Sequence, residues 1–237
     1  MQRGKLTQNI ALAAILSFTV FAAFAAFAAN DSAILAVKGR IVPPACDLKL
    51  SDSVVDFGDI HPGDLKWGEF TLLTERKMTL SINCSAPSRV ALHAKDYRTD
   101  SLVEPIGVDM GGGKGITKGT NYIFGLGQTG TSKIGAFSIV STADYLVDGK
   151  KLFQSSIQSS NGGVTWSGRD RIYITQKSSN TMASFKKEGN ENPNVPIPFK
   201  TLSTQVVLRA AINKPSELDF TKELKLDGSI AIELVYL

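Results

Sequence analysis

From residue 29 onward, the chain consists largely of short runs in which apolar and polar side chains alternate, separated by Gly, Pro, Asn, Asp and Ser. Successive side chains of a strand point to opposite faces, so this period of two predicts strands that bury one face. Within residues 79–84, Leu80, Ile82 and Cys84 fall on one face and the polar residues on the other. Strands are predicted at residues 34–42, 53–57, 78–84, 89–94, 121–126, 136–141, 171–176, 204–212 and 229–236.

No window carries a sustained apolar period of 3.6 residues, and short helical turns are expected only near residues 143–146 and 216–224. Many short strands separated by turn residues predict an all-β fold, and specifically a β-sandwich. Residues 104–195 are rich in Gly, Ser and Asn and are expected to form long surface loops around a few strands. This loop-rich region is either decoration on a single domain of residues 29–237 or a small second subdomain.

The C-terminal stretch has the clearest alternation. From Leu226 onward every second residue is apolar or small, ending in Ile230, Ile232, Leu234 and Tyr236. The sequence ends directly after this predicted strand, so its second edge is expected to be covered by an earlier strand or by another molecule.

The first residues resemble a secretory signal. A positively charged start is followed by an apolar run over residues 10–24 and by small residues at Ala26 and Ala28. This order is typical of a cleavable signal peptide, residues 1–28, with cleavage after Ala28. Cleavage after Ala25 and retention as a membrane anchor are the alternatives, since the apolar stretch is about long enough to span a bilayer.

The remaining chain is nearly neutral and carries one pair of cysteines. Arg3 and Lys5 leave with the signal, so 24 of the 26 basic residues face 22 acidic ones. This balance of charge does not favour nucleic acid as a partner. Stable membrane insertion after cleavage is not expected, because the sequence has no second long apolar run. Cys46 and Cys84, alone in an exported chain, most simply predict one disulfide.

The motifs of enzymes are weak, and neither an enzyme nor a cofactor or metal site is expected. The glycines at 125, 127 and 130 match a dinucleotide fingerprint, but strand and turn formers follow them, so a Gly-rich hairpin is predicted. His61 and His93 lie in different segments and are expected to be exposed and solvated. Trp67 and Trp166 are expected to cap the core, with an exposed carbohydrate platform as the alternative.

Several stretches together resemble a chaperone–usher fimbrial subunit of Gram-negative bacteria, and more closely the GltF-like group of pilin-like periplasmic proteins. The resemblance covers most of the chain after the signal. It is carried by Gly39-x-Ile41, Cys46, Val55-Asp56-Phe57-Gly58-Asp59-Ile60, residues 79–87, Phe124-Gly125-Leu126-Gly127, Lys133-Ile134-Gly135-Ala136, residues 196–201, Leu226-Asp227-Gly228-Ser229 and the ending Leu234-Val235-Tyr236-Leu237.

The resemblance implies an immunoglobulin-like sandwich that lacks its last strand. A periplasmic chaperone would lend a strand to the open groove, and another fimbrial subunit, delivered through an usher, would replace it by donor-strand complementation. The groove would be lined by Ile230, Ile232, Leu234 and Tyr236. The Cys46–Cys84 bridge would join the first strand to its neighbour. The candidate residues of an N-terminal donor strand are Ala33, Leu35 and Val37.

The chain departs from this family in two places. Fimbrial subunits usually have a Gly fourteen residues from the end, whereas this chain has Leu224 there and its glycine at Gly228. Cleavage after Ala28 also leaves a short N-terminal segment. The sequence therefore favours a minor or terminal subunit, located in the periplasm or in a fimbrium on the cell surface and associated with cell adhesion. The alternative is a self-complete periplasmic binding or regulatory protein that does not polymerise.

Overall fold

The computed structural model describes residues 34–42, 44–105, 108–111, 120–189 and 193–237. The chain divides into two units, residues 1–41 and residues 42–237. The described part of the first unit, residues 34–41, carries no helix or strand, and its side chains are exposed. The prediction of a strand at residues 34–42 is therefore wrong. The apolar residues alternate there, but the backbone of this segment is not paired with another strand.

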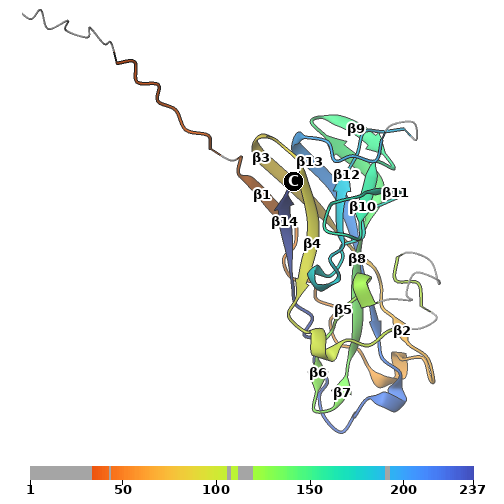
Figure 1. The fold of residues 1–237 in the computed structure, drawn as a ribbon. Helices are drawn as coiled ribbons and strands as arrows, with labels where there is room; N and C mark the ends of the chain where they lie inside the picture. Colours follow the sequence, from red (N-terminus) through yellow and green to blue (C-terminus); the bar gives the residue numbers. More distant parts are fainter. Residues whose placement is uncertain (1–33, 43, 106–107, 112–119, 190–192) are drawn as a thin grey trace, which may run out of the picture. The chain divides into compact units, whose positions relative to one another are not determined.

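The second unit is built from strands, confirming the predicted all-β fold (Figure 1). The strands are β1 (Cys46–Leu50), β2 (Thr71–Leu72), β3 (Arg76–Ser88), β4 (Val90–Asp96), β5 (Phe124–Gly125), β6 (Gln128–Thr129), β7 (Ser132–Lys133), β8 (Gly135–Val147), β9 (Lys150–Phe153), β10 (Ser156–Ser159), β11 (Ser167–Arg169), β12 (Met182–Phe185), β13 (Phe199–Ile212) and β14 (Ile230–Tyr236). Single 3-10 turns lie at Pro62–Asp64, Thr99–Ser101, Thr120–Tyr122, Lys177–Ser179 and Pro215–Glu217.

The strands form two main sheets and a small hairpin. The larger sheet has the order β1-β3-β13-β8-β5, with β2 added to β13 and β9 to β8. The smaller sheet has the order β11-β10-β12-β4-β14. Every strand pair among them is antiparallel. Within each sheet, one terminal strand comes from an end of the second unit: β1 from its beginning and β14 from its end.

The core lies between the two sheets, as expected for a sandwich. One continuous cluster of buried side chains includes Ile82 and Val206 from the larger sheet and Leu92 and Ala183 from the smaller one. Within β3, Met78, Leu80, Ile82 and Cys84 face this core, which confirms the alternation predicted for residues 79–84. A second, smaller cluster around Met110 and Ile123 lies on the outer face of β8 and β13.

Most of the strongly alternating runs form strands. The predictions at residues 78–84, 89–94, 136–141, 204–212 and 229–236 are confirmed, and that at 121–126 shrinks to Phe124–Gly125. The helical turn predicted at 143–146 is wrong, because these residues belong to β8. The turn predicted at 216–224 is present only at its start, in Pro215–Glu217.

Two further predicted strands are wrong, for two different physical reasons. At residues 53–57 the side chains of Val55 and Phe57 do pack against the core, but the segment has no ladder partner. Residues 171–176 make only isolated bridges, Tyr173 with Val140 of the larger sheet and Gln176 with Ala94 of the smaller one. That segment crosses from one sheet to the other, so it pairs with each only briefly.

Residues 104–195 contain β5 to β12, so their loops alternate with strands of both sheets. The glycines at 125, 127 and 130 lie in and around the β6–β7 hairpin, confirming a hairpin in place of a dinucleotide-binding helix.

Candidate functional site

The strand β14 forms one edge of the smaller sheet. Its seven residues pair with β4 in continuous register, from Ile230 opposite Asp96 to Tyr236 opposite Val90. Among the described residues, no strand pairs with its other edge. An open edge carries a row of backbone donors and acceptors that can template the addition of another strand.

The hydrogen-bonding pattern between β4 and β14 shows which residues of β14 point their backbone N–H and C=O groups toward the open edge. Tyr97 donates its N–H to Ser229 O at 3.0 Å, and Leu237 donates to Arg89 O at 3.0 Å. Hydrogen-bonded and non-hydrogen-bonded pairs alternate along an antiparallel ladder. The odd-numbered residues of β14 therefore bond to β4, and the even-numbered ones direct their backbone groups to the open edge.

The same even-numbered residues of β14 turn their side chains toward the core. Ile230, Ile232 and Leu234 pack against the core cluster but are only partly buried, whereas their partners Leu92 and Ala94 on β4 are fully buried. The open edge of β14 thus combines unpaired backbone with incompletely covered apolar side chains.

The strand β1 forms the facing edge of the larger sheet. Within the described part of the chain it pairs with β3 alone, from Cys46 opposite Cys84 to Leu50 opposite Leu80. Ser85 donates to Ala45 O at 2.9 Å, so the alternation of the ladder directs the backbone groups of Cys46, Leu48 and Leu50 away from β3. Their side chains are also partly buried against the core. We call the apolar strip between the free edges of β1 and β14 the open flank.

Beside the start of β14, the open flank deepens into a cavity of about 340 Å³. It is lined by Leu50, residues 52–55, Phe57 and residues 226–230, and Met78, Phe137 and Leu208 are among its other lining residues. A second cavity of about 690 Å³ shares Val55, Phe57 and Leu226 with the first. The walls of the smaller cavity are mainly apolar, which suits aliphatic or aromatic side chains of an occupant, whereas charged residues such as Asp59 and Lys222 also line the larger one.

The segment entering β14 is closely packed, which explains its glycine. A Cβ atom on Gly228 would lie 2.8 Å from Cε1 of Phe137 and 3.2 Å from Cδ2 of Leu126. The preceding residue, Asp227, donates its N–H to Leu126 O at 2.8 Å and forms an ion pair of 2.7 Å with Arg98. These contacts fix where β14 begins.

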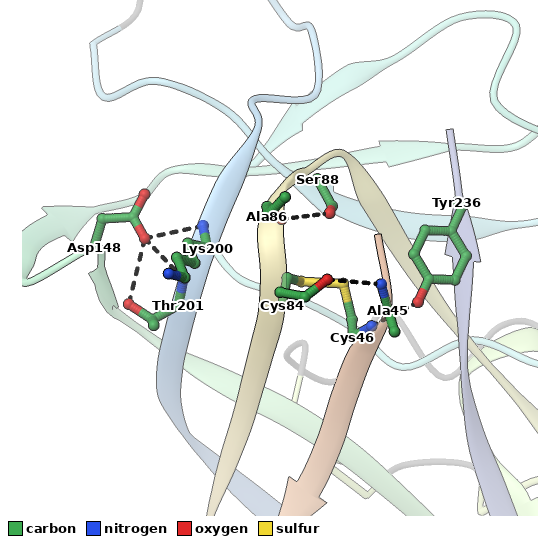
Figure 2. Close-up of a disulfide and its surroundings, with 10 residues drawn as sticks. Ala45, Cys46, Cys84, Ala86, Ser88, Asp148, Lys200, Thr201 and Tyr236 are labelled. Atoms are coloured by element: carbon green, nitrogen blue, oxygen red, sulfur yellow. Dashed lines mark hydrogen bonds between the residues drawn. A yellow bond between two sulfur atoms is a disulfide. The ribbon is translucent and has the colours of Figure 1, made fainter. Parts of the chain in front are cut away.

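The other end of the open flank lies at the disulfide. The Cys46–Cys84 bridge joins β1 to β3 with a Cα–Cα distance of 3.9 Å, confirming the predicted disulfide. The Cys46 N–H donates to the hydroxyl of Tyr236 at 2.8 Å, so a side chain of β14 reaches the edge of the opposite sheet. Figure 2 shows the disulfide on one side of Cys46 and the Tyr236 ring on the other.

The outer face of β14 carries one charged residue, Glu233, which is bonded to its own sheet. His93 Nε2 lies 3.1 Å from Oε2 of Glu233, which also receives the Lys177 ammonium at 2.8 Å. The hydrogen bond from Lys177, aided by that from His93, lowers the pKa of the Glu233 carboxyl despite an opposing effect of desolvation. His93 is only 9% exposed, so the expectation of a solvated histidine is wrong there, whereas His61 is exposed as expected.

The two tryptophans differ from one another. Trp67 is 87% exposed, so its predicted role as a core cap is wrong. Trp166 is half-buried, and its indole Nε1 donates to Gly163 O at 3.0 Å.

The residues singled out from the sequence are distributed as follows. Ile230, Ile232, Leu234 and Tyr236 come together on the core-facing side of β14. Leu35 and Val37 are 87% and 88% exposed in the first unit. Ala33 and the predicted signal peptide with Ala28 lie outside the described residues.

Sequence reasoning missed the second side of the flank. Leu48 and Leu50 of β1, together with Val55 and Phe57, supply it. The alternation of apolar residues at 46, 48 and 50 was the available signal, but the run is only five residues long.

Two kinds of site find no support in the described part of the chain. No group of three or more His, Cys, Asp or Glu residues is arranged there to hold a metal ion. No helix in the described ranges has the length and apolar character needed to cross a membrane.

Comparison with known proteins gives one family model and distant relatives. Residues 35–138 match the model of a family described as a protein of unknown function, DUF1120. The chain is 26% identical over 232 residues to the uncharacterized protein YhcF of Escherichia coli K12, covering 88% of this chain and 92% of that protein. It is also 26% identical over 256 residues to the protein GltF of the same organism, covering 96% of each. The similarity to both proteins extends over most of the chain.

Proposed function

We propose that this protein is a pilin-like subunit of a chaperone–usher system, exported to the periplasm. Its open flank receives a β-strand from a periplasmic chaperone, and another fimbrial subunit delivered at the usher later takes that place. The short segment before β1 favours a minor or terminal position in a fimbrium.

The observation that carries this proposal is the open edge of β14. Ile230, Ile232 and Leu234 direct both their free backbone groups and their partly buried side chains toward the flank. An added strand obtains affinity from backbone hydrogen bonds and specificity from alternate side chains that enter pockets. The cavity of about 340 Å³ beside Ile230 is such a pocket.

The absence of edge protection on β14 also supports the proposal. Exposed edges are commonly blunted by Lys, Pro or a bulge, which prevent unwanted pairing. The strand reads Ile-Ala-Ile-Glu-Leu-Val-Tyr, and its register with β4 is regular from Ile230 to Tyr236. Its one charged residue, Glu233, bonds to His93 and Lys177 on the outer face and so leaves the flank apolar.

Co-expression with periplasmic fimbrial chaperones tests this function. We expect a tagged chaperone to copurify the exported chain, residues 29–237, as a one-to-one complex. Ile232→Glu should reduce the recovered complex at least about tenfold, because an unpaired carboxylate would be buried under the added strand. Ala231→Glu is the matched control, since Ala231 faces outward opposite Lys95 and the new carboxylate gains an opposite charge. Equal recovery of both variants would contradict a strand-binding flank.

A self-complete periplasmic binding or regulatory protein is the second candidate. Its support is the single-chain core, in which Ile82 and Leu92 from the two sheets are fully buried without any partner. Under this function, purified residues 29–237 would be a monomer that unfolds cooperatively and does not bind a chaperone. Aggregation of the isolated chain, relieved by a chaperone, would instead favour the subunit.

A further inference from the structure

The hydroxyl of Tyr236 joins the two free edges of the open flank. It belongs to the last residue of β14 in the smaller sheet and accepts the Cys46 N–H of β1 in the larger sheet at 2.8 Å. Tyr236 is 50% exposed, so its side chain lies beside Cys46 at the disulfide end of the flank without being enclosed (Figure 2).

This hydrogen bond uses a backbone group that an added strand would need. The Cys46 N–H points away from β3, as do the backbone groups of Leu48 and Leu50. A strand lying between β1 and β14 would reach the Cys46 N–H with its own backbone and would occupy the space of the phenol.

We infer that Tyr236 and Cys46 form a latch that competes with an added strand for the disulfide end of the open flank. The inference rests on the proposed strand-binding function and adds a regulatory element to it. The latch holds the flank closed at that end while no strand is present, and it opens when a strand replaces the phenol. The disulfide supports the latch because it fixes the position of the Cys46 backbone against β3.

The Tyr236→Phe variant isolates the latch, because it removes only the hydroxyl. In the free protein the Cys46 N–H then loses its partner, whereas the strand-bound state loses nothing. A net hydrogen bond of ordinary strength therefore predicts that strand binding becomes about two- to tenfold tighter. Tyr97→Phe is the matched control, since Tyr97 follows the adjacent strand β4 and is 51% exposed.

The probe is a fluorescently labelled synthetic peptide of residues 29–42, which contains Ala33, Leu35 and Val37. Its dissociation constant is measured by fluorescence anisotropy with the exported chain and with both variants. Hydrogen exchange of the Cys46 amide is followed in the same proteins without peptide. We expect tighter binding and faster Cys46 exchange for Tyr236→Phe alone, with Tyr97→Phe matching the unmodified chain.

The possible failures are distinguishable. Equal peptide affinity for the exported chain and Tyr236→Phe would overturn the latch and leave the strand-binding function intact. Unchanged Cys46 exchange in Tyr236→Phe would overturn the latch as well. Lack of peptide binding to all three proteins, together with failure of a chaperone to copurify the exported chain, would overturn the strand-binding function itself, and the latch with it.

Discussion

The Cys46–Cys84 disulfide should contribute most of the stability that holds β1 in place. The strand is five residues long and pairs only with β3, and its other edge faces the open flank. The two cysteines are 38 residues apart, and the bridge constrains the unfolded chain over that loop. In the chain-entropy model, a loop of this length corresponds to about 4 kcal/mol of stabilisation at 25 °C.

The double variant Cys46→Ala/Cys84→Ala measures this contribution. Urea unfolding of residues 29–237 and of the same segment carrying both substitutions, followed by circular dichroism, should give free energies of unfolding that differ by about 4 kcal/mol. Cys84 is also buried in the core, so part of any loss in the variant could come from its missing sulfur. The unmodified chain reduced with dithiothreitol is the control, because it retains both sulfur atoms.

Comparing the oxidised chain, the reduced chain and the double variant shows whether the cross-link itself supplies the stability. If the cross-link is responsible, the reduced chain and the double variant lose similar free energies of unfolding. A loss below about 1 kcal/mol in the reduced chain would refute the loop argument and would mean that pairing with β3 alone holds β1.

Two further substitutions test the packing around β14. Gly228→Ala should lower the free energy of unfolding by about 1–3 kcal/mol in urea titrations, because the new methyl group meets the Phe137 ring; an unchanged value would contradict that close packing. Glu233→Gln should flatten the acid limb of a stability–pH profile. The folded-state pKa of Glu233 is lowered by Lys177, so its stabilisation is present above the unfolded pKa of about 4.5 and is lost as pH falls through the folded value. Parallel acid limbs for the two proteins would exclude this contribution.

The sequence correctly predicts those strands in which apolar and polar residues alternate and a neighbouring strand is available for pairing. In β3 and β13 the buried face is continuous over many residues, so period-two alternation gives both the element and the inward face. The same pattern at residues 53–57 gives the inward side chains Val55 and Phe57 correctly but not the absence of a ladder. Alternation reports which side chains are buried, whereas pairing depends on a partner that is distant in sequence.

The same limit applies to the candidate site. The core-facing residues of β14 are predictable, because alternation over seven residues is distinctive. The opposite edge was not predicted, because β1 is short and Cys46 meets Tyr236 across 190 positions of sequence. His93 was misjudged for a related reason. Its hydrogen-bond partner Glu233 lies opposite it on β14, 140 residues away in the sequence.

The two ends of the open flank bear directly on the choice between the candidate functions. At one end Tyr236 bridges to Cys46, and at the other Leu50, Val55 and residues 226–230 line the cavity of about 340 Å³. The chain therefore frames its own open edge, and Ile232 and Leu234 between these ends remain partly buried. A strand that binds only the folded state stabilises it by mass action, about 2.7 kcal/mol at a hundredfold excess over its dissociation constant. If a chain framed in this way folds alone, it still gains stability from an added strand, so the affinity for that strand would then separate a subunit from a self-complete protein.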